Sequence, residues 1–181
     1  MKSLALIVLA LALGLSLPAQ AGPNQAPFGD KVSPAITYYN RATPFVATSG
    51  ALKPGAASEL KALGFKAVLD IRGLKEGVAK AKTDLESVGL AFFNIPVVTR
   101  APTLDQVKQF TAIVEDPSNY PLLVYCKTAN RAGALWAMYR AAKGVPGEFA
   151  IEEGRTLGLK ASREGAVRNL LGLAPMPKPK G

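Results

Sequence analysis

The 181-residue chain contains no histidine and only one cysteine, Cys126. Without histidine the chain has neither a Ser-His-Asp triad nor a Cys-His pair, and a zinc site is not expected. A single cysteine also excludes an internal disulfide, so the fold depends on its hydrophobic core. We therefore expect a protein that uses no metal and no cofactor.

Acidic residues are scarce: 13 Asp and Glu face 22 Lys and Arg, which gives a formal charge of +9. A basic surface favours anionic partners such as phosphate esters, acidic polymers or anionic lipid headgroups. No stretch interleaves basic and aromatic residues, so a nucleic-acid partner is not expected. Residues 173–181 are expected to be a flexible basic tail, whose contact with a membrane would be weak at ~1 kcal/mol per lysine.

Long apolar runs are absent except near the start of the chain. Residues 4–17 are apolar, Lys2 precedes them, and a small-x-small cleavage motif follows at residues 19–21. The run is shorter than the roughly 20 residues of a membrane-spanning helix. This pattern predicts a signal peptide over residues 1–21. We expect an exported protein, periplasmic or secreted, and a mature monomer whose charge is +8 once Lys2 is removed.

The rest of the chain alternates between strand and helix patterns. A segment rich in proline and glycine, residues 22–34, is expected as an extended arm before a domain at residues 35–172. Strands are expected at residues 36–40, 45–48, 65–71, 90–95 and 122–125, and helices at residues 54–63, 74–88, 103–114, 132–142, 147–157 and 163–171. This alternation predicts an α/β fold, with a central, mostly parallel sheet flanked by helices.

The chemistry is concentrated in residues 122–136. An apolar strand delivers Cys126 to its end, and a helix follows Arg131. Four residues lie between them: Lys127, Thr128, Ala129 and Asn130. Loop amides and the positive end of the helix dipole would meet an oxyanion there, beside the Arg131 guanidinium. The same field favours the thiolate of Cys126, which would then be the nucleophile.

In this order, the segments resemble the dual-specificity and tyrosine phosphatase superfamily, and most closely the bacterial beta-lactamase-hydrolase-like phosphatases, which are also named sulfurtransferases. The resemblance covers roughly residues 36–144 and rests on residues 49–50, 60–72, 93–96 and the Cys126 loop. It implies a phosphatase in which cysteine forms a phosphocysteine, the loop amides and arginine bind the oxyanion, and an aspartate protonates the leaving group.

The chain departs from that family pattern in several places. Phosphatases usually place five residues between cysteine and arginine, whereas this chain has four, as do many rhodaneses. The family often has glycine where Ala129 stands, and serine or threonine where Ala132 stands. No carboxylate lies within residues 97–100, so the position of the general acid is not clearly filled. Asp105 and Asp70 are the two candidates. A favourable position in the first turn of a helix explains Asp105 better, and a structural ion pair or a hydrogen bond at the strand end explains Asp70 better.

Three functions remain open at this point. The first is an exported Cys-dependent phosphatase that hydrolyses phosphate monoesters of the protein-tyrosine or dual-specificity type. The second is a rhodanese-like sulfurtransferase, and the third is a catalytically impaired protein that binds an anion or a partner. Arg100 could add a second positive charge to an anion site, but a solvated loop arginine is the default interpretation. The resemblance implies that Arg72 and Glu76 form a structural salt bridge rather than act in catalysis.

Overall fold

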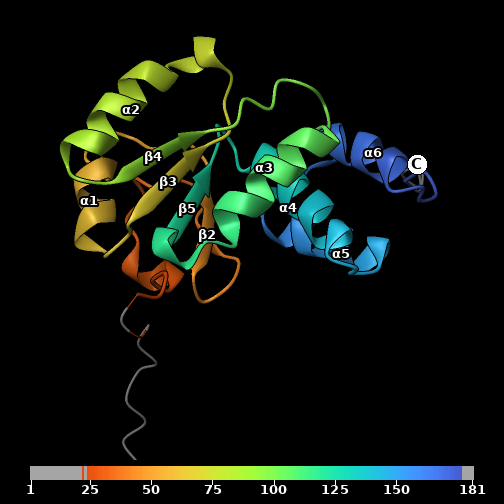
Figure 1. Cartoon of the computed structure of the whole chain (residues 1–181), viewed down its shortest axis with the longest axis horizontal. Coiled ribbons are helices and arrows are strands. Elements are labelled where there is room, and N and C mark those ends of the chain that lie inside the picture. Colours follow the sequence, from red (N-terminus) through yellow and green to blue (C-terminus); the bar gives the residue numbers. More distant parts are fainter. Residues whose placement is uncertain (1–21, 23, 177–181) are drawn as a thin grey trace, which may run out of the picture.

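The structure is a computed structural model, and it describes residue 22 and residues 24–176. A central sheet lies between two layers of helices, as Figure 1 shows. The signal peptide expected over residues 1–21 and the end of the expected tail, residues 177–181, lie outside the described residues. The predicted fold class, a mostly parallel sheet covered by helices, is confirmed.

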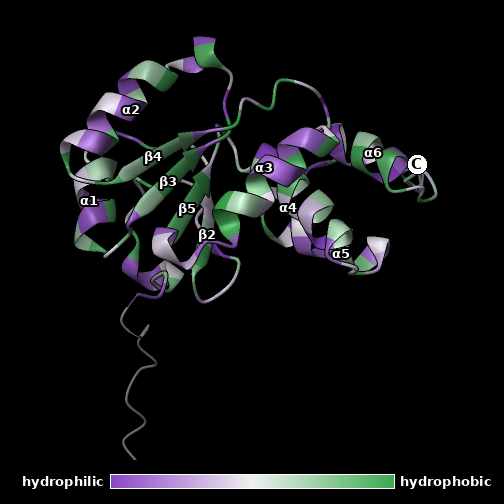
Figure 2. Ribbon diagram, viewed as in Figure 1, coloured by the Kyte–Doolittle hydropathy of each residue, from purple (hydrophilic) through white to green (hydrophobic). Residues whose placement is uncertain are grey.

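Five strands form the sheet: β1 (Asn40–Arg41), β2 (Val46–Ser49), β3 (Ala67–Asp70), β4 (Ala91–Asn94) and β5 (Leu122–Tyr125). Their order across the sheet is β1-β2-β5-β3-β4. Only the β1–β2 pairing is antiparallel, and β5 lies between β2 and β3 with Tyr125 opposite Ser49 and Asp70. Every residue of β3 and β5 is buried. Apart from Asp70 and the hydroxyl of Tyr125, these strands are apolar, because helices cover both faces of the sheet. They form the green centre of Figure 2.

Two helices, α1 (Ala56–Ala62) and α2 (Val78–Ser87), cover one face of the sheet. Leu60 of α1 and Leu85 of α2 pack in a buried core cluster that also contains Leu123 and Tyr125 of β5. The single helix expected at residues 74–88 is instead a short 3-10 helix (Leu74–Glu76) followed by α2. Gly77 separates the two with φ of 80°, a left-handed conformation that ends a helical turn.

The other face carries α3 (Leu104–Val114), α4 (Asn130–Ala142), α5 (Gly147–Thr156) and α6 (Ala161–Leu170). The expected capping box at the start of α3 is present, with Thr103 and Gln106 satisfying each other's backbone amides. The first nine residues of α4 are all buried, because the sheet, α3, α5 and α6 surround this helix. Gly133 permits the close approach, since a Cβ there would collide with the backbone of Gly154 and Leu159.

The expected strand at residues 36–40 is shorter than predicted and begins only at Asn40, while Ile36 forms an isolated bridge with Leu52. The segment expected as an extended arm is packed on the domain: Ala26 is buried, and its amide donates to the carbonyl of Pro44. Within the described residues, no helix has the length and apolar character needed to span a bilayer.

Candidate active site

Cys126 follows β5 at the carboxyl edge of the parallel strands, where the β5–α4 loop begins. Its amide donates to the carbonyl of Ser49 at 3.2 Å, and the amide of Ala51 donates to the carbonyl of Lys127 at 3.1 Å. The end of β2 therefore supports the loop from one side. The cysteine is 1% exposed and faces the core cluster of α3 and α4, whereas its neighbour Tyr125 faces α1 and α2.

The loop curls into a shape that fits an anion. Ala129 has φ of 60° and ψ of −10°, a left-handed conformation that glycine adopts more readily than alanine. In the described part of the chain, the amides of Lys127, Thr128, Asn130 and Arg131 donate to no backbone or side-chain acceptor. Successive amides around a left-handed residue form a concavity that binds anions.

Gly158 makes room for the side chain of Ala129 in this loop. A Cβ on Gly158 would lie 2.6 Å from the Cβ of Ala129, and the φ of Gly158 is +107°. The alanine that stands where the family often has glycine is thus accommodated by a glycine on the connection between α5 and α6. The loop keeps its curved form despite the additional methyl group.

Arg131 is held by a carboxylate from another element. Its two terminal nitrogens donate to Glu76 at 2.6 and 2.7 Å, and only 10% of its side chain is exposed. Hydrogen bonding to Glu76 raises the pKa of Arg131, and the nearby Cys126 acts in the same direction. The same bonds lower the pKa of Glu76 from 4.5 to about 2. Both groups are therefore charged at neutral pH, and Glu76 has no proton to donate.

The salt bridge expected between Arg72 and Glu76 is not formed. Arg72 instead pairs with Asp70 at 2.7 Å, and only the backbone carbonyl of Glu76 accepts from it. The Tyr125 hydroxyl donates to Asp70 at 2.6 Å and accepts from Arg72 at 2.8 Å. Asp70 thus lies on the α1–α2 side of the sheet in a buried structural cluster, opposite the face toward which Cys126 points.

The structure places Asp105 in the first turn of α3, where its carboxylate accepts from Gln109 at 2.6 Å. No contact of the described residues joins Asp105 to Cys126 or Arg131. Its role as general acid stays a prediction.

Residues just before α6 and in its first turn also reach the loop, and the sequence analysis did not identify them. The side chain of Asn130 accepts from the amide of Lys160 at 2.9 Å and donates to Ser162 at 3.0 Å. The next residue, Arg163, donates to the carbonyls of Thr99 and Arg100. Arg163 is a cation in the first turn of a helix, an unfavourable position unless an anion is near. Arg131 is likewise a cation at the start of a helix. Applied to the helix expected at residues 163–171, this feature would have identified Arg163 from the sequence.

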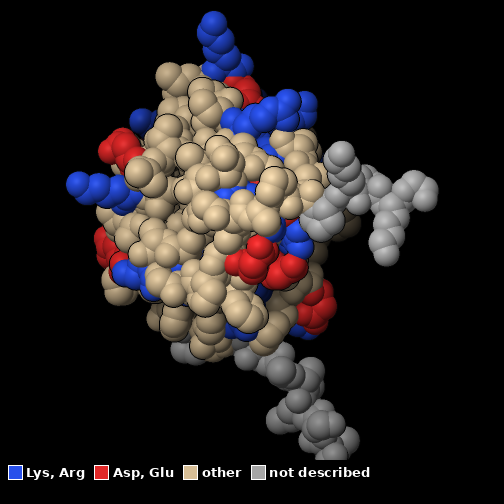
Figure 3. Space-filling view, turned by 90° about the vertical axis from the view of Figure 1, so that its right-hand side faces the viewer, with Lys and Arg blue, Asp and Glu red and all other residues tan. Residues whose placement is uncertain are grey.

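Basic and acidic side chains are interspersed on the face seen in Figure 3, and the larger blue groups lie in its upper half. Arg100, Arg131 and Arg163 are close enough to affect one another, because burial and then the charges of Arg131 and Arg100 lower the pKa of Arg163. The mouth of the Cys126 loop therefore has a positive potential.

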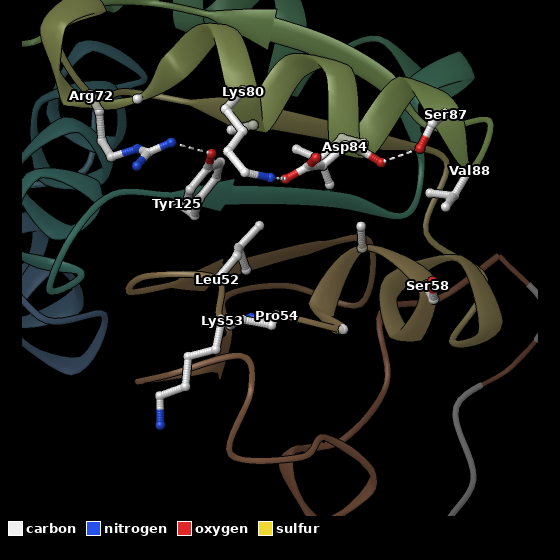
Figure 4. A pocket seen from close by; sticks show the side chains of 15 residues that line it. Leu52, Lys53, Pro54, Ser58, Arg72, Lys80, Asp84, Ser87, Val88 and Tyr125 are labelled. Carbon is white, nitrogen blue, oxygen red and sulfur yellow. Dashed lines mark hydrogen bonds and ion pairs between the residues drawn. The ribbon is translucent and has the colours of Figure 1, made fainter.

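A cavity of about 640 Å³ lies between α1 and α2, away from Cys126 and Arg131. Figure 4 shows that Lys80 pairs with Asp84 at 2.6 Å and that Arg72 contacts Tyr125, while the labelled side chain of Lys53 has no partner among the residues drawn. Arg72 is neutralised by Asp70. Most of the charge of this cavity is therefore compensated within the protein, and neither Cys126 nor Arg131 lines it.

Comparison with known proteins gives matches of two kinds, to a family model and to solved structures. Residues 48–167 match the model of a family described as DSP-PTPase phosphatase fused to NAD+ Kinase. No curated protein matches the sequence. Among solved structures, the chain is similar to a protein from Neisseria meningitidis classed as a phosphatase, with 25% identity and a TM-score of 0.62 over 76% of this chain and 99% of that one.

Two further structures share the fold. Tk-PTP in its active form is 19% identical, with a TM-score of 0.60 over 74% of this chain and 95% of that chain. The catalytic domain of the PP-IP phosphatase SIW14 from S. cerevisiae is 16% identical, with a TM-score of 0.61 over 74% of this chain and 85% of that chain.

Proposed function

The chain belongs to the family described as DSP-PTPase phosphatase fused to NAD+ Kinase, and we propose that this phosphatase hydrolyses phosphate monoesters through a phosphocysteine formed on Cys126. One observation carries the proposal: Cys126 lies at the base of a loop whose amides are unpaired, beside an arginine fixed by two bonds to Glu76. Amides and a guanidinium fixed in advance stabilise the charge of a phosphoryl group in transit.

In the first step, the thiolate of Cys126 attacks phosphorus and the bond from phosphorus to the ester oxygen breaks. The alcohol or phenol leaves with the electron pair of that bond and takes a proton from water. In the second step, water attacks the phosphocysteine, the sulfur–phosphorus bond breaks, and inorganic phosphate leaves while the thiolate is restored. Arg131 and the loop amides bind the non-bridging oxygens throughout.

We propose that the leaving group departs without strong help from an acid, because Asp105, the predicted candidate, bonds to Gln109 and makes no contact with Cys126 or Arg131 among the described residues. Glu76 is ionised at neutral pH, and Asp70 is held by Arg72 and Tyr125 on the far side of the sheet. General acid catalysis is typically worth about 10²–10⁴-fold. We therefore propose that aryl phosphates, including phosphotyrosine, are better substrates than alkyl phosphates.

The test is hydrolysis of p-nitrophenyl phosphate by the reduced protein lacking residues 1–21, beside the Cys126→Ser and Arg131→Ala variants. Both substitutions are expected to lower kcat/KM by at least about 10³-fold, because the nucleophile and the clamp act as one unit. Lys66→Gln is the control: this exposed lysine lies before β3, at the opposite edge of the sheet, and the substitution removes one positive charge.

Turnover that survives Cys126→Ser would refute the proposal. The four-residue spacing between Cys126 and Arg131 makes sulfur transfer the alternative, so thiosulfate and cyanide are assayed in parallel. Thiocyanate formation that depends on Cys126, without phosphatase activity, would assign the site to a sulfurtransferase.

We also propose export, supported by the leader pattern of residues 1–21. Fractionation of cells that express the full chain, with the mass of the recovered protein, tests this. Cleavage after Ala21 and recovery outside the cytoplasm are expected; an intact chain in the cytoplasm would contradict it. We further propose that the protein acts as a monomer on an anionic substrate.

A further inference from the structure

Two arginines beside the site have no acidic partner. Among the described residues, no carboxylate lies within 4.0 Å of Arg100 or Arg163. Arg131, by contrast, is neutralised by Glu76, and Arg155 and Arg168 are each paired with glutamates. Within the same residues, Arg41 also lacks an acidic partner, but it bonds to Gln25 and lies over the ring of Phe28. Arg100 and Arg163 are therefore the two uncompensated guanidinium groups beside the Cys126 loop.

A closed set of contacts holds these arginines against the loop. Arg163 donates to the carbonyls of Thr99 and Arg100, and Arg100 donates at 2.7 Å to the carbonyl of Ser162. Asn130, within the loop, fixes the side chain of Ser162. The loop after β4 and the start of α6 therefore present both guanidinium groups at one place.

These contacts position the arginines without neutralising them. Backbone carbonyls accept hydrogen bonds but carry no net charge. Each guanidinium has five N–H donors, and in both arginines one terminal nitrogen makes the bonds described above. Arg163 is also partly buried, so its positive charge is incompletely solvated, and this lowers its pKa. The charges of Arg131 and Arg100 act in the same direction, while Cys126 and Glu76 act in the opposite one. A second anion at this position would relieve both costs.

We propose that Arg100 and Arg163 form a second phosphate subsite, and that the substrate carries two phosphate groups. One phosphate occupies the Cys126 loop and reacts there, while the other is bound by the two guanidinium groups. The inference rests on the proposed phosphatase function, because it assigns the substrate class for the same site. Arginine suits this role because its planar fork matches phosphate oxygens.

The first test compares phenyl phosphate with hydroquinone bisphosphate and resorcinol bisphosphate, which share an aryl leaving group. The wild-type protein is expected to prefer at least one bisphosphate by about tenfold or more in kcat/KM, beyond the twofold statistical factor. Arg163→Gln and Arg100→Gln are expected to reduce this ratio toward two, and Lys66→Gln is expected to preserve it. Arg163→Lys keeps the charge and is expected to keep part of the preference.

A purely structural role for these arginines predicts a different pattern. The substitutions would then lower kcat/KM equally for phenyl phosphate and for the bisphosphates, and the ratio of the two values would stay constant. That pattern, or a wild-type ratio near two, would overturn the proposal. Added salt is a further check, because the preference is expected to shrink as ionic strength rises.

The second test does not depend on turnover. Calorimetry on the Cys126→Ser protein measures binding of the same three compounds, and the bisphosphates are expected to bind about tenfold more tightly than phenyl phosphate. This preference is expected to fall in the Cys126→Ser/Arg163→Gln double variant. If no substrate is hydrolysed but the binding preference is present, the phosphatase mechanism fails and the second subsite stands. Equal binding of all three compounds would overturn the subsite.

Discussion

Glu76→Gln tests how Arg131 is held. Glu76 has a pKa of about 2 in the folded protein against an ordinary value of 4.5, mainly because it accepts hydrogen bonds from Arg131. At about 1.4 kcal/mol per pKa unit, the full difference would correspond to about 3 kcal/mol. Since 37% of the Glu76 side chain is exposed, solvent screens part of this energy, and we expect a loss of about 1–2 kcal/mol at pH 7.

The pH dependence has a defined sign. The folded-state pKa of Glu76 lies below its ordinary value, so its contribution is complete above pH 4.5 and is lost as the pH falls toward about 2. Urea denaturation of the two proteins between pH 7 and pH 3 should show a stability gap that narrows below about pH 4.5.

Glu86→Gln is the control for this experiment, because Glu86 is exposed and lies 3.9 Å from Lys82. The Glu86→Gln substitution should lower the free energy of unfolding by no more than about 0.5 kcal/mol. A Glu76→Gln protein as stable as the wild type at pH 7, or a gap independent of pH, would refute the reasoning.

Three other changes have expected outcomes. Gly158→Ala places a Cβ 2.6 Å from that of Ala129 at a φ of +107°, so denaturation should show a loss of about 2–4 kcal/mol; adding Ala129→Gly should restore part of it, and an undiminished stability would contradict the packing. Asn130→Ala removes the bonds to Lys160 and Ser162, and should lower kcat/KM for p-nitrophenyl phosphate by about tenfold; unchanged kinetics would show that the α6 connection does not position the loop. Leu135→Ala in the core of α4 should cost about 2–5 kcal/mol by thermal or urea denaturation, and a loss below about 1 kcal/mol would contradict its complete burial.

The fold could be predicted from the sequence because the patterns that mark its strands and helices involve neighbouring residues. The apolar strands Leu122–Tyr125 and Ala67–Asp70, and the capping box of α3, each identify an element from neighbouring residues. The superfamily resemblance, which rests on such segments, is confirmed by the family match over residues 48–167. The ends of the elements were harder to predict from the sequence. Gly77 interrupts the apolar pattern of residues 74–88, which otherwise predicts a single helix.

The contacts of the site could not be predicted in the same way, because they join residues far apart in the chain. Glu76 and Arg131 are 55 positions apart, and the sequence favoured the nearer partner Arg72. Arg163 and Thr99 are 64 positions apart. Only the tertiary packing of α6 against the loop after β4 brings them together. The roles of Cys126 and Arg131 themselves stay predictions, although the structure places both at one loop.

The phosphocysteine itself is the most direct test of the mechanism. The reduced protein is mixed with a ³²P-labelled aryl phosphate, quenched during turnover, and digested to locate the label. The mechanism predicts label on the peptide that contains Cys126 in the wild-type protein, and none in Cys126→Ser. Phosphate release at an undiminished rate by Cys126→Ser, or label on another residue, would contradict it.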